Sequence, residues 1–267
     1  MAAAMEGGRR VAWDPDQYHR YGDHRLRPAL ELFARVDHPS PKQVHDLGCG
    51  GGEIARLMAE RWPEASVVGS DYSNAMLEKA SAVPSRVDWQ QLDVRAWAPS
   101  EPLDVIYSNA MLQWVDGHSE IFPKLMRSLA PRGLLAVQMP LSWGEPSHRL
   151  MRETLEEGGF GSSELRRTVA RKWVAEAHEY YDLLRPLAAS LDIWETRYHQ
   201  VLTGEDPVLE WVKGTGLRPV LEGLAQDELS RFLDIYRARL AEAYPKRPGG
   251  ETLYPFPRLF IVARARG

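Results

Sequence analysis

The sequence predicts an α/β fold with a mostly parallel sheet and a helical elaboration after it. Two observations carry this prediction. Over residues 27–140, apolar runs typical of buried strands alternate with amphipathic stretches typical of helices. Repeated strand-helix units place the strands parallel and the helices on both faces of the sheet. From residue 142 onward the pattern changes to long amphipathic stretches with few strands.

The first helix is predicted over RPALELFARV, residues 27–36. Pro28 fits a first helical turn, and the apolar residues Ala29, Leu32, Phe33 and Val36 share one face. The elements that follow alternate. Strands are predicted for a run ending at Leu47, a run ending at Asp71, Val87 to Leu92, Leu103 to Asn109 and Leu134 to Pro140, and helices for Ile54 to Met58, Ser73 to Ala80 and Ile121 to Leu129.

The second half of the chain predicts helices over Lys172 to Leu187 and Gln226 to Tyr244, with one strand, IWETRYHQ, between them. PRLFIVARA near the end is too apolar for an exposed edge strand and is expected to return to the main sheet. We therefore divide the chain into a flexible tail (1–12), a ligand-binding part (13–141), a mostly helical substrate-binding part (142–255) and a final strand (256–267).

The composition excludes several classes of protein. A net charge of -4 argues against nucleic acid or an anionic membrane as the main partner, since both favour a strongly basic surface. Cys49 is the only cysteine, so the chain can form neither an internal disulfide nor a cysteine-rich zinc site, and the eight histidines lack metal-ligand spacing. We expect a cytoplasmic enzyme without a metal, a signal peptide or a membrane anchor, either a monomer or a weak homo-oligomer.

The stretch HDLGCGGGE, residues 45–53, directly follows the first predicted strand. Glycines there let the backbone approach a ligand, and the next helix offers free N–H groups. The spacing departs from the dinucleotide pattern G-x-G-x-x-G, because Glu53 stands at the third glycine. Asp46 and Glu53 would repel a pyrophosphate but suit a cationic, amino-bearing ligand. An NAD-dependent oxidoreductase is therefore disfavoured.

Two further acids end the next predicted strands. Asp71 stands where a carboxylate could hold a ribose diol, and Asp93 where one could meet an adenine amine. Either could instead cap a helix, as Asp71 could ahead of Ser73. Together with the glycine turn, these acids favour a sulfonium nucleoside that carries an amino-acid tail. A non-catalytic protein that binds such a nucleoside stays an alternative.

DLGCGGGE, Asp71, the Asp93–Val94 pair and SNAMLQW resemble the class I S-adenosylmethionine-dependent methyltransferases. Across nearly the whole chain, WDPDQYHRY, EWVKGTGLRP, FPRLFIVAR and other segments resemble the trans-aconitate 2-methyltransferase family. The chain departs from that family at Gly51, where relatives often carry proline, and at the longer, more polar GFGSSELRR.

This resemblance implies a Rossmann-like sheet with an antiparallel last strand and a helical lid. It also implies S-adenosylmethionine as cofactor, S-adenosylhomocysteine as product, and trans-aconitate or a similar small polycarboxylate as acceptor. Another small acid or a hydroxyl compound is the alternative acceptor. A carboxylate is already ionised at neutral pH, so no general base is expected.

The resemblance also assigns roles to individual residues. Those implied to bind the cofactor are Asp46, Gly48, Gly50, Gly52, Asp71, Met76, Asp93, Val94 and Asn109. Gln113 and Trp114 are implied to position the reacting groups. The implied acceptor-binding residues are Trp143, Tyr180, Tyr181, Arg218 and Arg258. The aromatic residues could equally belong to the core, and the arginines to the surface.

Overall fold

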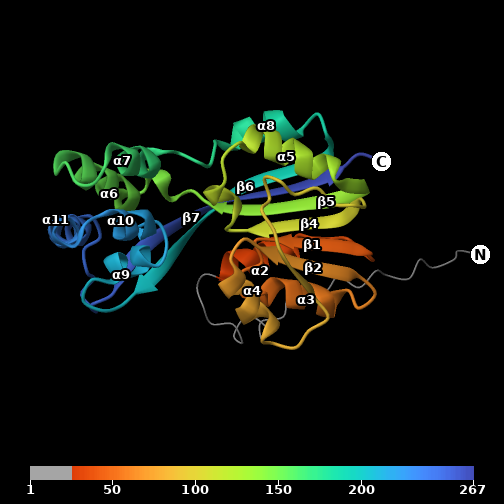
Figure 1. Cartoon of the computed structure of the whole chain (residues 1–267), viewed down its shortest axis with the longest axis horizontal. Coiled ribbons are helices and arrows are strands. Elements are labelled where there is room, and N and C mark those ends of the chain that lie inside the picture. The colour runs from red at the N-terminus through yellow and green to blue at the C-terminus, as the bar shows by residue number, and fades with distance from the viewer. Residues whose placement is uncertain (1–25) are drawn as a thin grey trace, which may run out of the picture.

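The computed structural model describes residues 26–267, so the predicted tail and the lead over Trp13 to His24 lie outside the described residues. Within 26–267 the strands form one seven-stranded sheet in the order β3-β2-β1-β4-β5-β7-β6 (Figure 1). Only β7 runs antiparallel to its neighbours, which confirms the predicted fold class. The strands are β1 (Gln43–Leu47), β2 (Ser66–Asp71), β3 (Asp88–Gln91), β4 (Leu103–Asn109), β5 (Leu129–Pro140), β6 (Ala188–Leu202) and β7 (Thr252–Ala265).

Helices lie between most of these strands. Those of the first half follow the predicted alternation, whereas the second half contains more helices than the two that the sequence pattern predicts. In the first half they are α2 (Leu26–Ala34), α3 (Glu53–Arg61), α4 (Asn74–Ser81), α5 (His118–Arg127) and the short 3-10 helices η1 (Leu112–Trp114) and η2 (Ser142–Gly144). In the second half they are α6 (Pro146–Glu157), α7 (Ser163–Ala170), α8 (Ala177–Leu184), α9 (Pro207–Lys213), α10 (Arg218–Gly223) and α11 (Gln226–Ala243).

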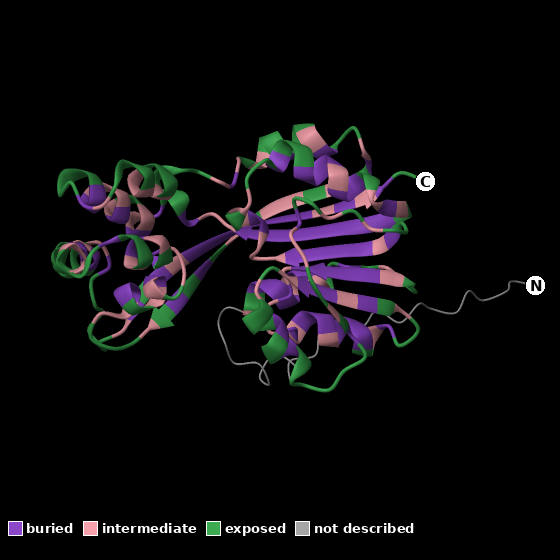
Figure 2. Ribbon diagram, viewed as in Figure 1, coloured by how far each residue is buried: buried purple, intermediate pink, exposed green. Residues whose placement is uncertain are grey.

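The central strands β1, β4, β5 and β7 are buried because helices cover both faces of the sheet, whereas the edge strands β3 and β6 are more exposed (Figure 2). On β4, Val105 and Tyr107 pack into a core that also contains apolar residues of α2 and α3. Ile106, between them, packs into a second core with apolar residues of α5 and α8. The Tyr107 hydroxyl donates a hydrogen bond to the Ala29 carbonyl at 2.8 Å and so ties α2 to the sheet.

A second lobe of helices surrounds the extended ends of β6 and β7 (Figure 1). β7 pairs with β5 over residues 258–264 but with β6 along its whole length, so the β6–β7 hairpin projects beyond the sheet. Pro255 and Pro257 lie in this projecting part, where β5 no longer pairs with β7. A missing N–H is tolerated there because one side of the strand has no ladder partner.

Several predicted boundaries differ from the structure. The helix predicted over 172–187 begins only at Ala177, where Glu176 and Glu179 form a capping box, and it ends at Leu184. IWETRYHQ is the central part of the longer strand β6, and Leu129 begins β5 rather than ending a helix. β7 begins at Thr252, so the boundary predicted at 255/256 falls within a strand. Long-range pairing decides the strand ends, which local periodicity does not reveal, whereas the start of α8 follows from the local capping box.

Candidate functional site

The glycine turn after β1 is a tight backbone loop in which Gly48, Gly50 and Gly52 all have a positive φ, a conformation that glycine adopts more readily than other residues. The N–H groups of Gly48 and Cys49 both donate to the Ser70 carbonyl, at 2.8 and 2.9 Å. Gly48 has a φ of 77°, and a Cβ there would lie 2.3 Å from the Met111 side chain. Gly50 has a φ of 54°, yet a Cβ there would meet no atom within 4 Å. The turn is therefore closed towards Met111 and open at Gly50.

Acidic side chains surround this turn. Asp46 is buried, and burial together with the neighbouring Asp71 and Glu53 carboxylates raises its pKa to about 8. A buried carboxyl with this pKa keeps its proton at neutral pH unless a positive charge approaches. The turn is thus electrostatically suited to a cation, in agreement with the charge pattern of the sequence.

Asp71 organises the loop with both of its carboxylate oxygens. Oδ2 accepts from the Gly50 N–H at 3.0 Å, and Oδ1 accepts from the Ser73 N–H at 2.9 Å. Ser73, at the N-cap of α4, makes no side-chain capping bond. Asp71 therefore supports both the glycine turn and the start of α4. Each oxygen can accept a further hydrogen bond, so these contacts leave Asp71 able to bind a ribose. The ribose contact itself stays a prediction.

Asp93 lies after β3 and forms a close ion pair with Arg95, whose Nη2 is 2.5 Å from Oδ2. Hydrogen bonds from the side chain and the backbone N–H of Arg95 hold the pKa of the Asp93 carboxyl below its usual value. Val94 is buried in the second core, whereas Met76 is exposed. Tyr72, which directly follows Asp71 in the chain, is 72% exposed.

The segment after β4 contains a strained residue. Ala110 has a φ of 54°, a left-handed conformation that is rare for a residue with a Cβ, and its N–H donates to the Gln138 carbonyl at 2.9 Å. Gln113 Nε2 in turn donates to the Ala110 carbonyl at 2.5 Å. Such strain is found most often at functional sites. The Trp114 side chain that follows is exposed.

His118 and Tyr180 form a buried hydrogen-bonded pair behind this segment. His118 Nε2 lies 2.9 Å from the Leu112 carbonyl and Nδ1 lies 2.6 Å from the Tyr180 hydroxyl. Burial lowers the pKa of His118, which favours a neutral ring that donates to Leu112 and accepts from Tyr180. Tyr180 is 1% exposed and also accepts from the Ala175 N–H. This placement favours a core role for Tyr180 over acceptor contact.

The other predicted acceptor residues lie in different surroundings. Arg258 on β7 is 7% exposed, and its guanidinium lies 3.6 Å from the centre of the Phe256 ring. Arg218 begins α10, is 65% exposed and pairs with Glu222 at 3.5 Å. Trp143 is exposed on η2, where its indole N–H donates to the Ala170 carbonyl. Tyr181 is exposed on α8.

Unpartnered buried polar atoms gather at the ends of β4 and β5. Within residues 26–267, Asn109 Oδ1, Gln113 Oε1 and both polar atoms of Gln138 have no hydrogen-bond partner. Gln138 was missed by the sequence reasoning, although one amide inside the apolar run LLAVQMP was the available signal. Buried polar groups are normally hydrogen-bonded, so this cluster marks a place where a polar ligand is expected.

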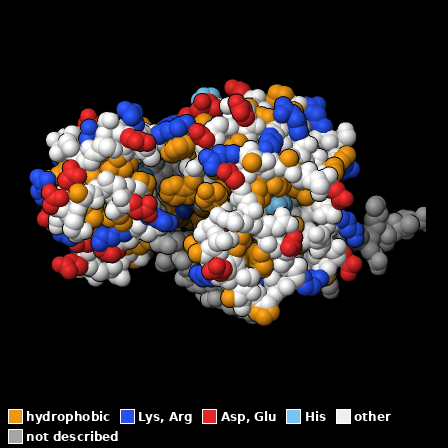
Figure 3. Space-filling model, in the orientation of Figure 1, with side chains coloured by type: hydrophobic (Ala, Val, Ile, Leu, Met, Phe, Trp, Pro, Cys, Tyr) orange, Lys and Arg blue, Asp and Glu red, His pale blue; other side chains and the backbone are white. Residues whose placement is uncertain are grey.

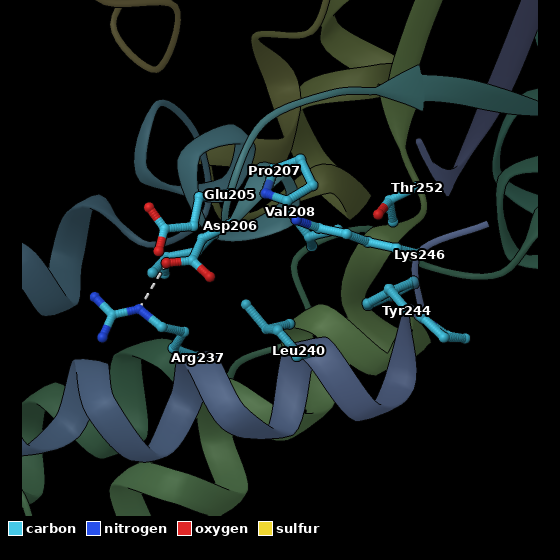
Figure 4. A pocket seen from close by; sticks show the side chains of 12 residues that line it. Glu205, Asp206, Pro207, Val208, Arg237, Leu240, Tyr244, Lys246 and Thr252 are labelled. Atoms are coloured by element: carbon cyan, nitrogen blue, oxygen red, sulfur yellow. Dashed lines mark ion pairs between the residues drawn. The ribbon is translucent and has the colours of Figure 1, made fainter. Parts of the chain in front are cut away.

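The surface is hollowed between the two lobes, and hydrophobic side chains gather in this hollow (Figure 3). A separate cavity of about 400 Å³ lies in the helical lobe (Figure 4). It is lined by residues including Asp206, Val208, Arg237, Leu240 and Tyr244, and Arg237 pairs with Asp206 at 2.7 Å across its rim. No predicted site residue lines this cavity.

Residues 26–267 contain no group of three or more His, Cys, Asp or Glu side chains arranged to hold a metal ion. None of the helices in this part of the chain combines the length and the apolar character needed to cross a membrane.

Comparison with known proteins places this geometry in context. A family model described as a methyltransferase domain matches residues 18–183. A trans-aconitate 2-methyltransferase of Azoarcus sp. is 48% identical, over 94% of this chain and 98% of the relative. One from Acidovorax ebreus is 44% identical, with the same coverage of both chains.

Solved structures resemble the fold at low sequence identity. The YcgJ protein of Bacillus subtilis superposes with a TM-score of 0.59 and 14% identity, covering 91% of this chain and 100% of that one. A Haemonchus contortus phosphoethanolamine N-methyltransferase, solved with phosphomonomethylethanolamine and S-adenosylhomocysteine, gives 0.52 and 15%, covering 90% of this chain and 53% of that one. At these identities the likeness concerns the fold alone.

Proposed function

This chain belongs to the trans-aconitate 2-methyltransferase family, and from that premise we propose that it methylates one carboxylate of trans-aconitate or a similar small polycarboxylate, using S-adenosylmethionine. The observation that carries the proposal is the division of the site between a glycine turn lined by acids and a region of buried amides beside Arg258. A cationic donor and an anionic acceptor need these two environments.

The residues of the glycine turn fit the proposed cofactor. The open side of Gly50 leaves room for a ligand to approach the backbone, and Asp46 and Glu53 favour a positively charged amino-acid tail. We assign Asp71 to the ribose and Asp93 to the adenine amine. S-adenosylmethionine supplies a methyl group attached to a positively charged sulfur.

The acceptor needs little chemical activation. Its carboxylate has an ordinary pKa of about 4 and is ionised at neutral pH, so no side chain has to remove a proton. The protein instead has to hold the oxygen in line with the methyl group, and such positioning can contribute up to about 7–11 kcal/mol. We assign this role to Gln113 and Trp114, which follow the strained Ala110.

Arginine is the side chain best suited to hold the remaining carboxylates, because its guanidinium donates two parallel hydrogen bonds. Arg258 is our main candidate, since a buried guanidinium acts in a lower dielectric than an exposed one. Arg218, Trp143 and Tyr181 stay secondary candidates. We also propose a cytoplasmic location, which the single cysteine supports.

Steady-state assays with a panel of mono-, di- and tricarboxylates test the proposal. The expected result is formation of a methyl ester and S-adenosylhomocysteine, with trans-aconitate among the acids of highest kcat/KM. Faster turnover of a monocarboxylate or a hydroxyl compound would contradict the acceptor class. Tighter binding of NAD than of S-adenosylhomocysteine in calorimetry would contradict the cofactor.

A further inference from the structure

Gln138 on β5 has a buried polar side chain. It is 1% exposed, and neither Nε2 nor Oε1 has a hydrogen-bond partner in the described part of the chain. Its chain neighbours Val137 and Met139 are buried and apolar. A leucine or methionine at this position would avoid the desolvation of two polar atoms, so the amide weakens the fold unless a ligand satisfies it.

Strand register places Gln138 within a row of side chains on one face of the sheet. Gln138 pairs with Asn109 on β4 and with Phe260 on β7. Phe260 packs into the core that contains α2 and α3, so Gln138 faces the same side. Arg258 is two residues before Phe260 and points to that side as a diagonal neighbour of Gln138.

The chemistry of this row indicates which ligand group it would bind. Gln138 Nε2 carries two N–H donors, and Arg258 adds a positive charge with further donors. This pairing of a neutral donor with a guanidinium is complementary to a carboxylate. Asn109, on the other side of Gln138, offers an unpartnered amide oxygen and is complementary to a donor such as an ammonium group.

We infer that Gln138 and Arg258 together form the subsite for one carboxylate of the acceptor, and that Gln138 determines specificity for acids. This inference rests on the proposed function and adds to it a residue that sequence reasoning did not identify. Gln138 Nε2 donates to a carboxylate oxygen, and Arg258 supplies the balancing charge. Asn109 Oδ1, next in the row, faces the amino end of the cofactor.

Kinetics of Gln138→Leu and Gln138→Met test the subsite, with Met139→Leu as the matched control. Met139 is the next residue on β5 and is buried in the opposite core, so this volume-conserving change perturbs the strand equally without touching the row. Each Gln138 variant is expected to raise the KM for trans-aconitate about 10- to 100-fold, the range for a lost hydrogen bond to a charged group.

Two further measurements separate binding from folding. S-adenosylhomocysteine affinity should change less than twofold, and the melting temperature should not fall, because each variant removes two unpartnered polar atoms. The double variant Gln138→Leu/Arg258→Lys should raise KM by less than the product of the single changes, since both residues hold one carboxylate.

An unchanged KM in a folded Gln138 variant would overturn the inference, as would multiplicative effects in the double variant. An equal loss of cofactor affinity would move Gln138 to the cofactor site. If the wild-type protein turns over no polycarboxylate, the proposed function and this inference fall together. If it turns over trans-aconitate and the Gln138 variants do so equally well, only the inference falls.

Discussion

The two halves of the sheet's carboxyl edge differ in charge. Asp46 and Asp71 lie at the ends of β1 and β2, and Asp93 follows β3, where it pairs with Arg95. At the ends of β4 and β5, and beside them on β7, lie amides and the Arg258 guanidinium. The carboxyl edge of a single sheet can therefore bind a cation at one half and an anion at the other. The predictions that follow change residues of the two halves in turn.

The largest effect is expected for Gly48→Ala, which adds a Cβ inside the glycine turn. The new Cβ would lie 2.3 Å from Met111 on a backbone with a φ of 77°. Overpacking and strain together are expected to lower the free energy of unfolding by about 2–5 kcal/mol and to abolish cofactor binding. Denaturant unfolding and cofactor titration measure both effects. Gly144→Ala is the control, because a Cβ there meets no atom within 4 Å. Equal stability of the two variants would contradict this account of the turn.

The next effect is on the other half of the edge. Arg258→Ala is expected to raise the KM for trans-aconitate about 10- to 100-fold, which corresponds to about 1.5–3 kcal/mol for a lost hydrogen bond to a charged group, and to leave cofactor affinity unchanged. Arg258→Lys should restore only part of the loss, since an ammonium lacks the two-point fork. Arg218→Ala serves as comparison.

Arg218 is largely exposed and paired with Glu222, so its KM effect should stay within about 1 kcal/mol, the scale of surface ion pairs. Steady-state kinetics of the three variants decide between them. A larger effect at Arg218 than at Arg258 would move the acceptor clamp to the helical lobe.

A smaller effect is expected for Asp71→Ala. Loss of the ribose contact should weaken cofactor binding by about 1.5–2 kcal/mol. Because Asp71 also accepts from Gly50 and Ser73, the melting temperature should fall as well. Calorimetry and thermal melts report the two losses, and Ser73→Ala, which removes no capping bond, is the control. If stability falls and cofactor affinity does not, Asp71 supports the loop alone.

A last prediction concerns the pH dependence of Asp46. Its pKa is about 8 in the folded protein and 3.8 when unperturbed, so the folded state retains a proton that the unfolded state releases between these values. Wild-type stability therefore contains a contribution that is lost as pH rises through this window. Asp46→Asn lacks this contribution, so its stability relative to wild type should increase as the pH rises from 4 to 8. A constant difference across that range would show that Asp46 is ionised throughout.

The sequence by itself was sufficient to predict the fold class and the chemistry of the acidic half. Strand and helix periods are local, so the alternating pattern predicted the mostly parallel sheet that the structure has. The glycine turn and its acids are neighbours in the chain, and charge alone indicated a cationic ligand. The family resemblance, which the relatives confirm, came from motifs of the same local kind.

Only the tertiary structure decided which residues form the other half. Gln138 and Arg258 are far apart in the chain and become neighbours through the register of β5 with β7. Tyr180 looked like Tyr181 in sequence, yet one is buried against His118 and the other is exposed. Arg258 and Arg218 also look alike in sequence, yet Arg258 is buried and Arg218 is exposed. Burial and strand register arise from contacts between distant segments, and a local pattern carries no information about which distant segment will pack against it.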